Sequence, residues 1–198
     1  MKARKPALLI IDVVNHFDFP QGTALGRNAR GIARRILALR ERFDRRGRPV
    51  VYINDNWTQW QGGFDDLVAG CIEAGGDSAH LARLLAPAKQ HFHVLKPKHS
   101  AFVQSALPTL LEQQESDAVV ITGLATDSCV LATALDAHMM GYPIWVPSDC
   151  TAAIDATRKR GALTLLRHNT QASTLSSAKV QGLFPETAER GGRTLARL

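Results

Sequence analysis

The sequence has 198 residues, 45% of them hydrophobic and 21% charged, and no apolar run approaches the roughly 20 residues that a membrane helix needs. The net charge of +6 does not indicate nucleic-acid binding, because the basic residues are spread along the chain without the interleaved aromatic residues of a single-strand binder. Three widely spaced cysteines with no Cys-x-x-Cys pair argue against a disulfide framework and a zinc ribbon, and favour a reducing cytoplasm.

The first half of the chain predicts two strands and a helix. Residues 7–14 form an apolar run that contains one carboxylate, Asp12. The run is typical of a strand buried on both faces, and not of a signal peptide. Asn28 is expected to cap a helix that runs to about Arg46, with apolar residues at helical spacing. Residues 49–55 predict the second strand. Residues 56–78 follow as a long connection, a kind of segment that is often functional.

The second half continues the same alternation. Its expected elements are a short helix near 80–85, a strand at 91–96, a helix near 107–114, a strand at 119–123 with its helix, a strand at 143–149, a helix near 155–168 and a weaker sixth strand at 171–175. Alternating strands and helices predict an α/β protein, a three-layer αβα Rossmann-like fold with a mainly parallel sheet of about six strands. We expect one domain over residues 1–198, with 183–198 as a loosely attached tail.

The most informative stretch surrounds Cys129. A β-branched run ends at Gly123, and residues 126–128 are Thr, Asp and Ser, which favour a helix N-terminus. A thiol in that first helical turn meets the positive end of the helix dipole and unpaired N–H groups, which favour the nucleophilic thiolate. The alternative is that Cys129 is a small apolar residue that packs a strand–helix corner.

Polar residues are expected at the carboxyl ends of the strands, where a parallel α/β sheet places its site. Those at predicted strand ends are Asp12, Asp55, Lys96 and Asp149, and Cys129 opens the helix after the fourth strand. Asp12 and Lys96 adjoin apolar runs, where an unpartnered charge is costly. A thiol, a carboxylate and an ammonium in one crevice suit covalent acyl-group chemistry.

These segments resemble a known family, the isochorismatase-like cysteine hydrolases, which include nicotinamidases, carbamoylsarcosine amidases and ureidoacrylate hydrolases. The resemblance spans residues 7–175. It is carried, in matching order and spacing, by Leu9-Ile10-Ile11-Asp12-Val13-Val14-Asn15-His16-Phe17, Lys96-Pro97-Lys98-His99-Ser100-Ala101-Phe102 and Gly123-Leu124-Ala125-Thr126-Asp127-Ser128-Cys129-Val130.

The resemblance implies a catalytic triad of Asp12, Lys96 and Cys129. Lys96 takes the role and not Lys98, because Lys96 stands five residues before Ala101 of the Ser-Ala-Phe element.

The resemblance also implies a cis peptide bond between Leu124 and Ala125 in the turn before the cysteine. The N–H groups of Ala125 and Cys129 would then bind the developing oxyanion.

Departures from the family pattern limit the reactions that this chain is expected to catalyse. Metal-binding nicotinamidases resemble one another in an Asp-x-His pattern after the second strand, whereas this chain has Asp55-Asn56-Trp57 and its next histidine is His80. We therefore expect no metal, no other cofactor and no nicotinamidase activity. Isochorismatases proper lack the nucleophilic cysteine, so the presence of Cys129 disfavours their vinyl-ether reaction.

The remaining cysteines and the aromatic residues have assigned roles. Cys150 lacks the helix N-terminal pattern and is expected to be structural, and Cys71, in the long connection, is expected to be structural or a surface thiol. Phe17, Trp57 and Trp60 predict a substrate pocket with aromatic walls, and a packed loop is the alternative.

The sequence therefore predicts a metal-independent cytoplasmic hydrolase that cleaves an amide, ureide or N-carbamoyl C–N bond of a small molecule through a thioester on Cys129. Because oligomers are usual in that family, the resemblance also implies a homo-oligomer, a dimer or tetramer. A catalytically silent ligand-binding or scaffold protein of the same fold is the main alternative. A nucleotide-binding Rossmann protein is disfavoured, because no Gly-x-Gly-x-x-Gly turn follows the first strand.

Overall fold

The sheet of this protein is parallel throughout the part of the chain that is described. A computed structural model gives residues 4–56 and 61–185. The strands lie in the order β3-β2-β1-β4-β5, and β6 pairs with the far end of β4. Their bounds are β1 Pro6–Ile11, β2 Val50–Asp55, β3 Phe92–Lys96, β4 Ala118–Leu124, β5 Ile144–Trp145 and β6 Thr151–Ala152. The predicted α/β fold with about six parallel strands is confirmed.

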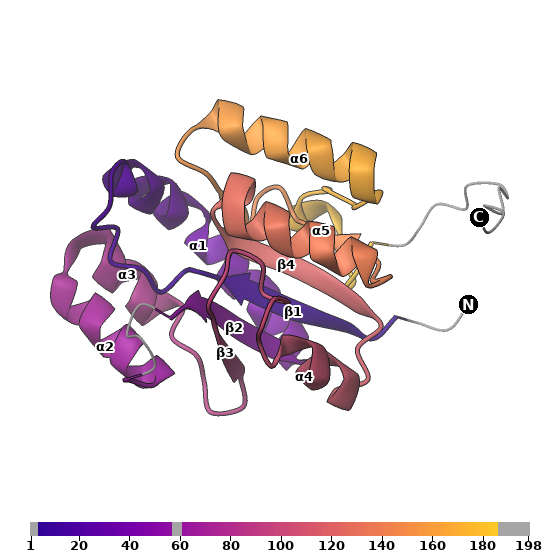
Figure 1. Cartoon of the computed structure of the whole chain (residues 1–198), viewed down its shortest axis with the longest axis horizontal. Helices are drawn as coiled ribbons and strands as arrows, with labels where there is room; N and C mark the ends of the chain where they lie inside the picture. The colour runs from indigo at the N-terminus through magenta and orange to yellow at the C-terminus, as the bar shows by residue number, and fades with distance from the viewer. Residues whose placement is uncertain (1–3, 57–60, 186–198) are drawn as a thin grey trace, which may run out of the picture.

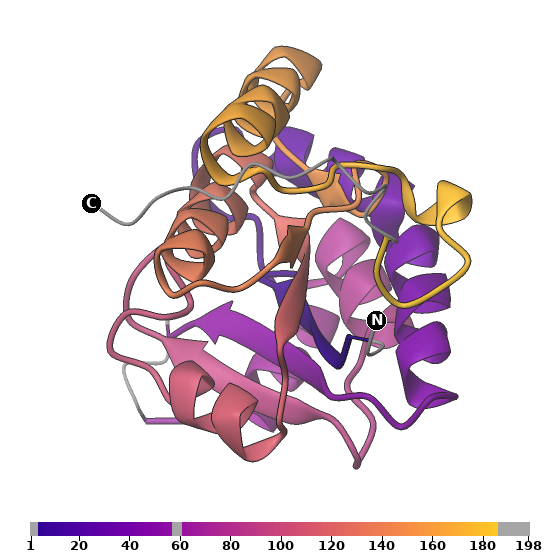
Figure 2. The same ribbon diagram turned by 90° about the vertical axis from the view of Figure 1, so that its right-hand side faces the viewer.

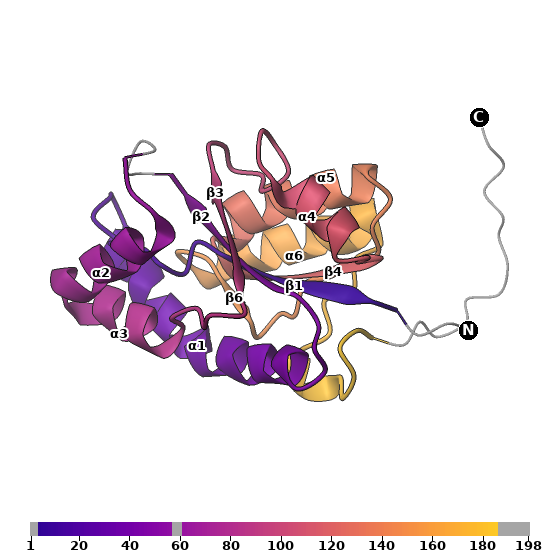
Figure 3. The same cartoon turned by 90° about the horizontal axis from the view of Figure 1, so that it is seen from below.

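Helices cover both faces of the sheet, as Figures 1 and 3 show. One layer consists of α1 Gly22–Asp44, α2 Phe64–Ala74 and α3 Gly76–Leu84; the other consists of α4 Leu107–Gln113, α5 Leu131–Met139 and α6 Ala156–Thr170. Strand β1 contributes core side chains to both helix layers, because successive side chains of a strand point to opposite faces of the sheet. Leu8 and Ile10 pack with α1, whereas Leu9 and Ile11 pack with α4 and α5. Among the described residues, no helix is both long and apolar enough to cross a bilayer.

Helix α1 begins seven residues earlier than predicted. It starts at Gly22, after Gln21 in a left-handed conformation with φ 67°. The predicted cap, Asn28, lies inside the helix, and its amide donates instead to the carbonyls of Ala153 and Ile154 at 3.0 and 2.9 Å. The cap prediction was wrong because this side chain has a partner 125 residues away in the sequence.

The connection predicted over residues 56–78 contains all of α2 and the first three residues of α3. Helix α2 begins after Gly63, whose N–H donates to the Asp66 carboxylate at 2.7 Å. Gly75, with φ 78°, separates α2 from α3. Closely spaced glycines around α2 obscure its helical pattern in the sequence, since glycine is a poor helix former.

The last strands are shorter than predicted. Strand β5 ends at Trp145, the chain turns as the N–H of Cys150 donates to the Pro147 carbonyl at 2.9 Å, and it re-enters the sheet as β6. The predicted sixth strand at 171–175 contributes only a single bridge between Ser173 and Trp145. Pro147 supplies no N–H, so it cannot continue a central strand.

The segment that follows α6 runs back along α1, in yellow beside the purple helix in Figure 2. The Arg42 guanidinium of α1 donates to the carbonyls of Ser177, at 3.1 Å, and of Val180 and Gly182. Leu183 and Phe184, the first residues of the predicted tail, pack partly buried against the core beneath α1. Residues 186–198 lie outside the described part of the chain.

Candidate active site

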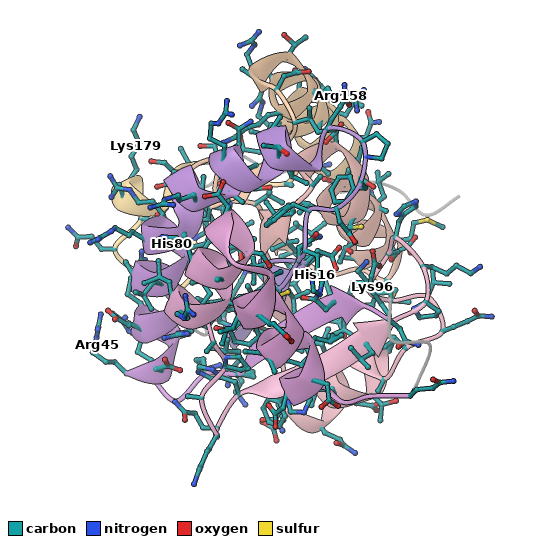
Figure 4. The ribbon with its side chains drawn as sticks, turned by 90° about the vertical axis from the view of Figure 1, so that its left-hand side faces the viewer. His16, Arg45, His80, Lys96, Arg158 and Lys179 are labelled. Carbon is teal, nitrogen blue, oxygen red and sulfur yellow. The ribbon has the colours of Figure 1, made fainter. Side chains whose placement is uncertain are left out.

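Four chemically active side chains meet at the carboxyl edge of the sheet. Asp12 follows β1, Asp55 ends β2, Lys96 ends β3, and Cys129 follows β4. Asp55 and Lys96 are partners in the β2–β3 register, and Ile11 pairs with both Ile53 and Gly123. The strand order therefore brings the predicted triad residues together. Lys96 lies at this edge in Figure 4, near His16 of the loop after β1.

Asp12 is held rigidly by its own backbone and by its neighbours. Its N–H donates to the Ile53 carbonyl at 2.8 Å, and its φ of 51° turns the chain away from the sheet. One carboxylate oxygen accepts the Asp55 N–H at 2.9 Å, and the other lies 3.0 Å from Lys96 Nζ. Burial raises the pKa of Asp12 to about 6, although the Lys96 ammonium opposes that rise. A carboxyl group with this pKa can both accept and return a proton near neutral pH.

Lys96 is completely buried and lies at the centre of the group. Its Nζ contacts the carboxylates of Asp12 and Asp55 and lies 3.4 Å from Cys129 Sγ. Burial disfavours the ammonium, but the charge of Asp12 and the contacts with Cys129 and Asp55 outweigh that effect and raise the pKa of Lys96. Lys96 therefore stays charged and can stabilise a thiolate.

Cys129 lies in a π-helical turn, Thr126–Val130, between β4 and α5, and is only 6% exposed. Burial, followed by the nearby Asp12 carboxylate, raises the pKa of its thiol to about 12, although Lys96 acts in the opposite direction. The resting thiol is therefore protonated. We expected the helix dipole to favour the thiolate, but desolvation and the neighbouring carboxylate dominate. Attack by this sulfur needs a base.

The turn before Cys129 is fixed by buried hydrogen bonds. The Thr151 hydroxyl donates to the Gly123 carbonyl and pairs with the Thr126 hydroxyl, both at 2.9 Å. The cis bond implied between Leu124 and Ala125 is not found, since no peptide bond of the described residues is cis. That expectation from the family resemblance was wrong.

Two further polar side chains adjoin the predicted triad. Asp55 contacts the Lys96 ammonium while its side chain remains 55% exposed. His99 Nδ1 lies 3.6 Å from Cys129 Sγ and 3.4 Å from the Ser128 hydroxyl. Asp55 was expected at this edge of the sheet but not as a member of the triad, and His99 was not expected to contact the cysteine. The contact of His99 depends on how the loop after β3 folds, which no local pattern indicates.

The structure describes one of the three predicted substrate-binding residues. Phe17 is buried in the core cluster beneath α1, where its ring lies close to Gly26. Trp57 and Trp60 lie outside the described residues. The aromatic pocket walls therefore remain a prediction.

A metal ion does not fit this arrangement. One potential ligand atom from each of Asp12, Asp55 and Cys129 lies within 4.8 Å of the others. Lys96 Nζ contacts all three residues, so the position between them holds an ammonium group whose charge repels a cation.

The other two cysteines are buried away from this group of side chains. Cys71 packs among the helices of the α1 layer, and burial raises the pKa of its thiol. Burial also raises the pKa of Cys150 to about 12, and its sulfur lies 3.8 Å from an Asp149 carboxylate oxygen. Cys129, by contrast, lies 3.4 Å from the Lys96 ammonium.

Known proteins are similar to this chain in fold and in part of its sequence. Residues 6–179 match the isochorismatase domain. An uncharacterised isochorismatase family protein of Bacillus subtilis, YaaI, is 36% identical over 85% of this chain and 92% of its own. The maleamate amidohydrolase of Pseudomonas putida is 27% identical over 74% and 72% of the two chains. The crystal structure of N-carbamoylsarcosine amidase from Thermoplasma acidophilum superposes with a TM-score of 0.69, at 28% identity, over 90% of this chain and 99% of that one.

Proposed function

The chain belongs to the isochorismatase family, and from that premise we propose that it hydrolyses a C–N bond of a small amide, ureide or N-carbamoyl compound through a thioester on Cys129. The observation that carries the proposal is the position of Lys96 Nζ, 3.0 Å from Asp12 and 3.4 Å from Cys129. The names of two relatives, an amidohydrolase and an amidase, support the choice of bond.

In the first half-reaction Asp12 accepts the thiol proton, and the sulfur attacks the carbonyl carbon. The Lys96 ammonium stabilises the thiolate as it forms, which offsets the burial that keeps the resting thiol protonated. The N–H groups of Ala125 and Cys129 are the proposed oxyanion donors, with the Leu124–Ala125 peptide bond trans and not cis as the resemblance implied. The C–N bond then breaks, and Asp12 gives its proton to the departing nitrogen.

In the second half-reaction a water molecule attacks the thioester. Asp12 accepts a proton from this water, the C–S bond breaks, and the proton returns to the Cys129 sulfur. Asp12 thus takes up and returns one proton in each half-reaction, a task suited to a pKa of about 6. Lys96 keeps its charge throughout.

A substrate screen tests the proposal directly. The purified chain should release ammonia from at least one member of a panel of primary amides, N-carbamoyl compounds and ureides. Ammonia is measured for each compound beside a Cys129→Ala sample, which subtracts contaminating activity. Release that persists in the Cys129→Ala sample would contradict the thioester mechanism. Release that requires an added metal ion would contradict the expected independence of metals.

The pH dependence should report Asp12. This residue must be ionised to accept the thiol proton, so kcat/KM should rise as the pH rises through about 6 and then level off. An acid limb near the ordinary aspartate pKa of about 3.9 would show that burial does not raise the pKa of Asp12. Asp12→Asn should lower kcat/KM at least about 100-fold on the plateau above pH 6 and remove this limb.

A further inference from the structure

Asp55 occupies the boundary between the buried triad and solvent. Its carboxylate contacts the Lys96 ammonium, and its backbone N–H donates to Asp12 at 2.9 Å. Asp12, Lys96 and Cys129 are each no more than 6% exposed, whereas the Asp55 side chain is 55% exposed. Among these four residues, Asp55 is thus the charged group that an incoming molecule can reach most directly.

The charges of the group do not cancel. Two carboxylates, those of Asp12 and Asp55, face the single ammonium of Lys96, and the Cys129 thiol is neutral at rest. Two neighbouring groups have partners of their own. Asp127 pairs with Arg158 at 3.5 Å, and the His99 imidazole contacts the Cys129 sulfur. The four side chains Asp12, Asp55, Lys96 and Cys129 together carry a net negative charge, and Asp55 is its exposed part.

We propose that Asp55 is a specificity-determining residue that admits neutral or cationic substrates, accepts their N–H groups, and disfavours substrates with a carboxylate near the scissile bond. This inference rests on the proposed role of Cys129 as the nucleophile. A ureide or N-carbamoyl group offers several N–H donors, which match a carboxylate acceptor. A substrate carboxylate would instead meet a like charge in a partly desolvated site.

Two alkylating reagents of similar size but different charge test the inference without a known substrate. Iodoacetamide is neutral and iodoacetate is anionic. With either, the Cys129 sulfur forms a C–S bond as the C–I bond breaks, iodide departs, and the thiol proton passes to Asp12. The alkylation rate of the Cys129 peptide is measured by mass spectrometry, and the quantity compared is the iodoacetamide rate divided by the iodoacetate rate.

The rate ratio should be about 5- to 20-fold larger for the natural chain than for Asp55→Asn at low salt. The intrinsic reactivities of the reagents cancel in this comparison. About 1 M salt should shrink the difference, since it screens charges beyond roughly 3 Å. Asp65→Asn, an equal charge change on the exposed first turn of α2, should leave the ratio within about twofold of the natural value. Asp55→Ser should reproduce Asp55→Asn, which guards against a folding defect of one variant.

The outcomes separate this inference from the proposed function. If Cys129 reacts with iodoacetamide but Asp55→Asn and Asp55→Ser leave the ratio unchanged, Asp55 does not select by charge and the nucleophile assignment stands. If Cys129 reacts no faster than Cys71 and Cys150, both proposals are overturned.

Discussion

Replacing Cys129 with alanine should lower kcat by at least about 10⁴-fold, because loss of a covalent nucleophile removes the reaction path and not merely a contact. The fold should survive. The substitution removes one sulfur atom from a cluster whose other members stay in place, and Lys96 keeps both carboxylate partners. We expect a change of about 1 kcal/mol in the free energy of unfolding.

Cys150→Ala is the matched control for this experiment. Cys150 is also buried, and the pKa of its thiol is also raised to about 12, but its contacts are with Asp149 and not with Lys96. Ammonia release from whichever compound the screen identifies should therefore persist in Cys150→Ala and vanish in Cys129→Ala. Both variants are compared by circular dichroism and by urea unfolding. Turnover of Cys129→Ala above about 1% of the natural rate would rule out the thioester.

The central strands could be predicted from sequence because each is a short apolar run with both faces buried. The predicted strands at 49–55 and 119–123 lie within one residue of the central strands β2 and β4. The ends of the sheet depend on long-range partners instead. Asn28 forms no cap because its amide binds two carbonyls near β6, and β6 itself exists through its pairing with β4.

The arrangement of the site residues could be predicted from the fold, but the protonation state of the Cys129 thiol could not. Parallel strands carry Asp12 and Lys96 to one edge, so their meeting with Cys129 could be predicted from strand order. The state of the thiol depends on how deeply α5 and the loop after β3 bury it, which is a tertiary property. For the same reason, the sequence suggested a favoured thiolate where the structure has a thiol that needs a base.

Gly123→Ala should have the largest effect on stability, about 3–5 kcal/mol of lost unfolding free energy. Gly123 lies at the end of β4 with φ 102°, a conformation that residues with a side chain rarely adopt. An added Cβ would lie 2.0 Å from the carbonyl oxygen of Ile11, a backbone atom of the neighbouring strand. That strand cannot yield without moving Asp12, which follows Ile11 directly.

Gly31→Ala provides the matched control, because Gly31 lies within α1 and an added Cβ would have no atom within 4 Å. Alanine there should be neutral or stabilising by up to about 1 kcal/mol. Urea unfolding measures both variants, and Gly123→Ala should also melt roughly 10 °C lower than the natural chain. A Gly123→Ala variant within about 1 kcal/mol of the natural stability would show that β1 and β4 can separate freely at this point.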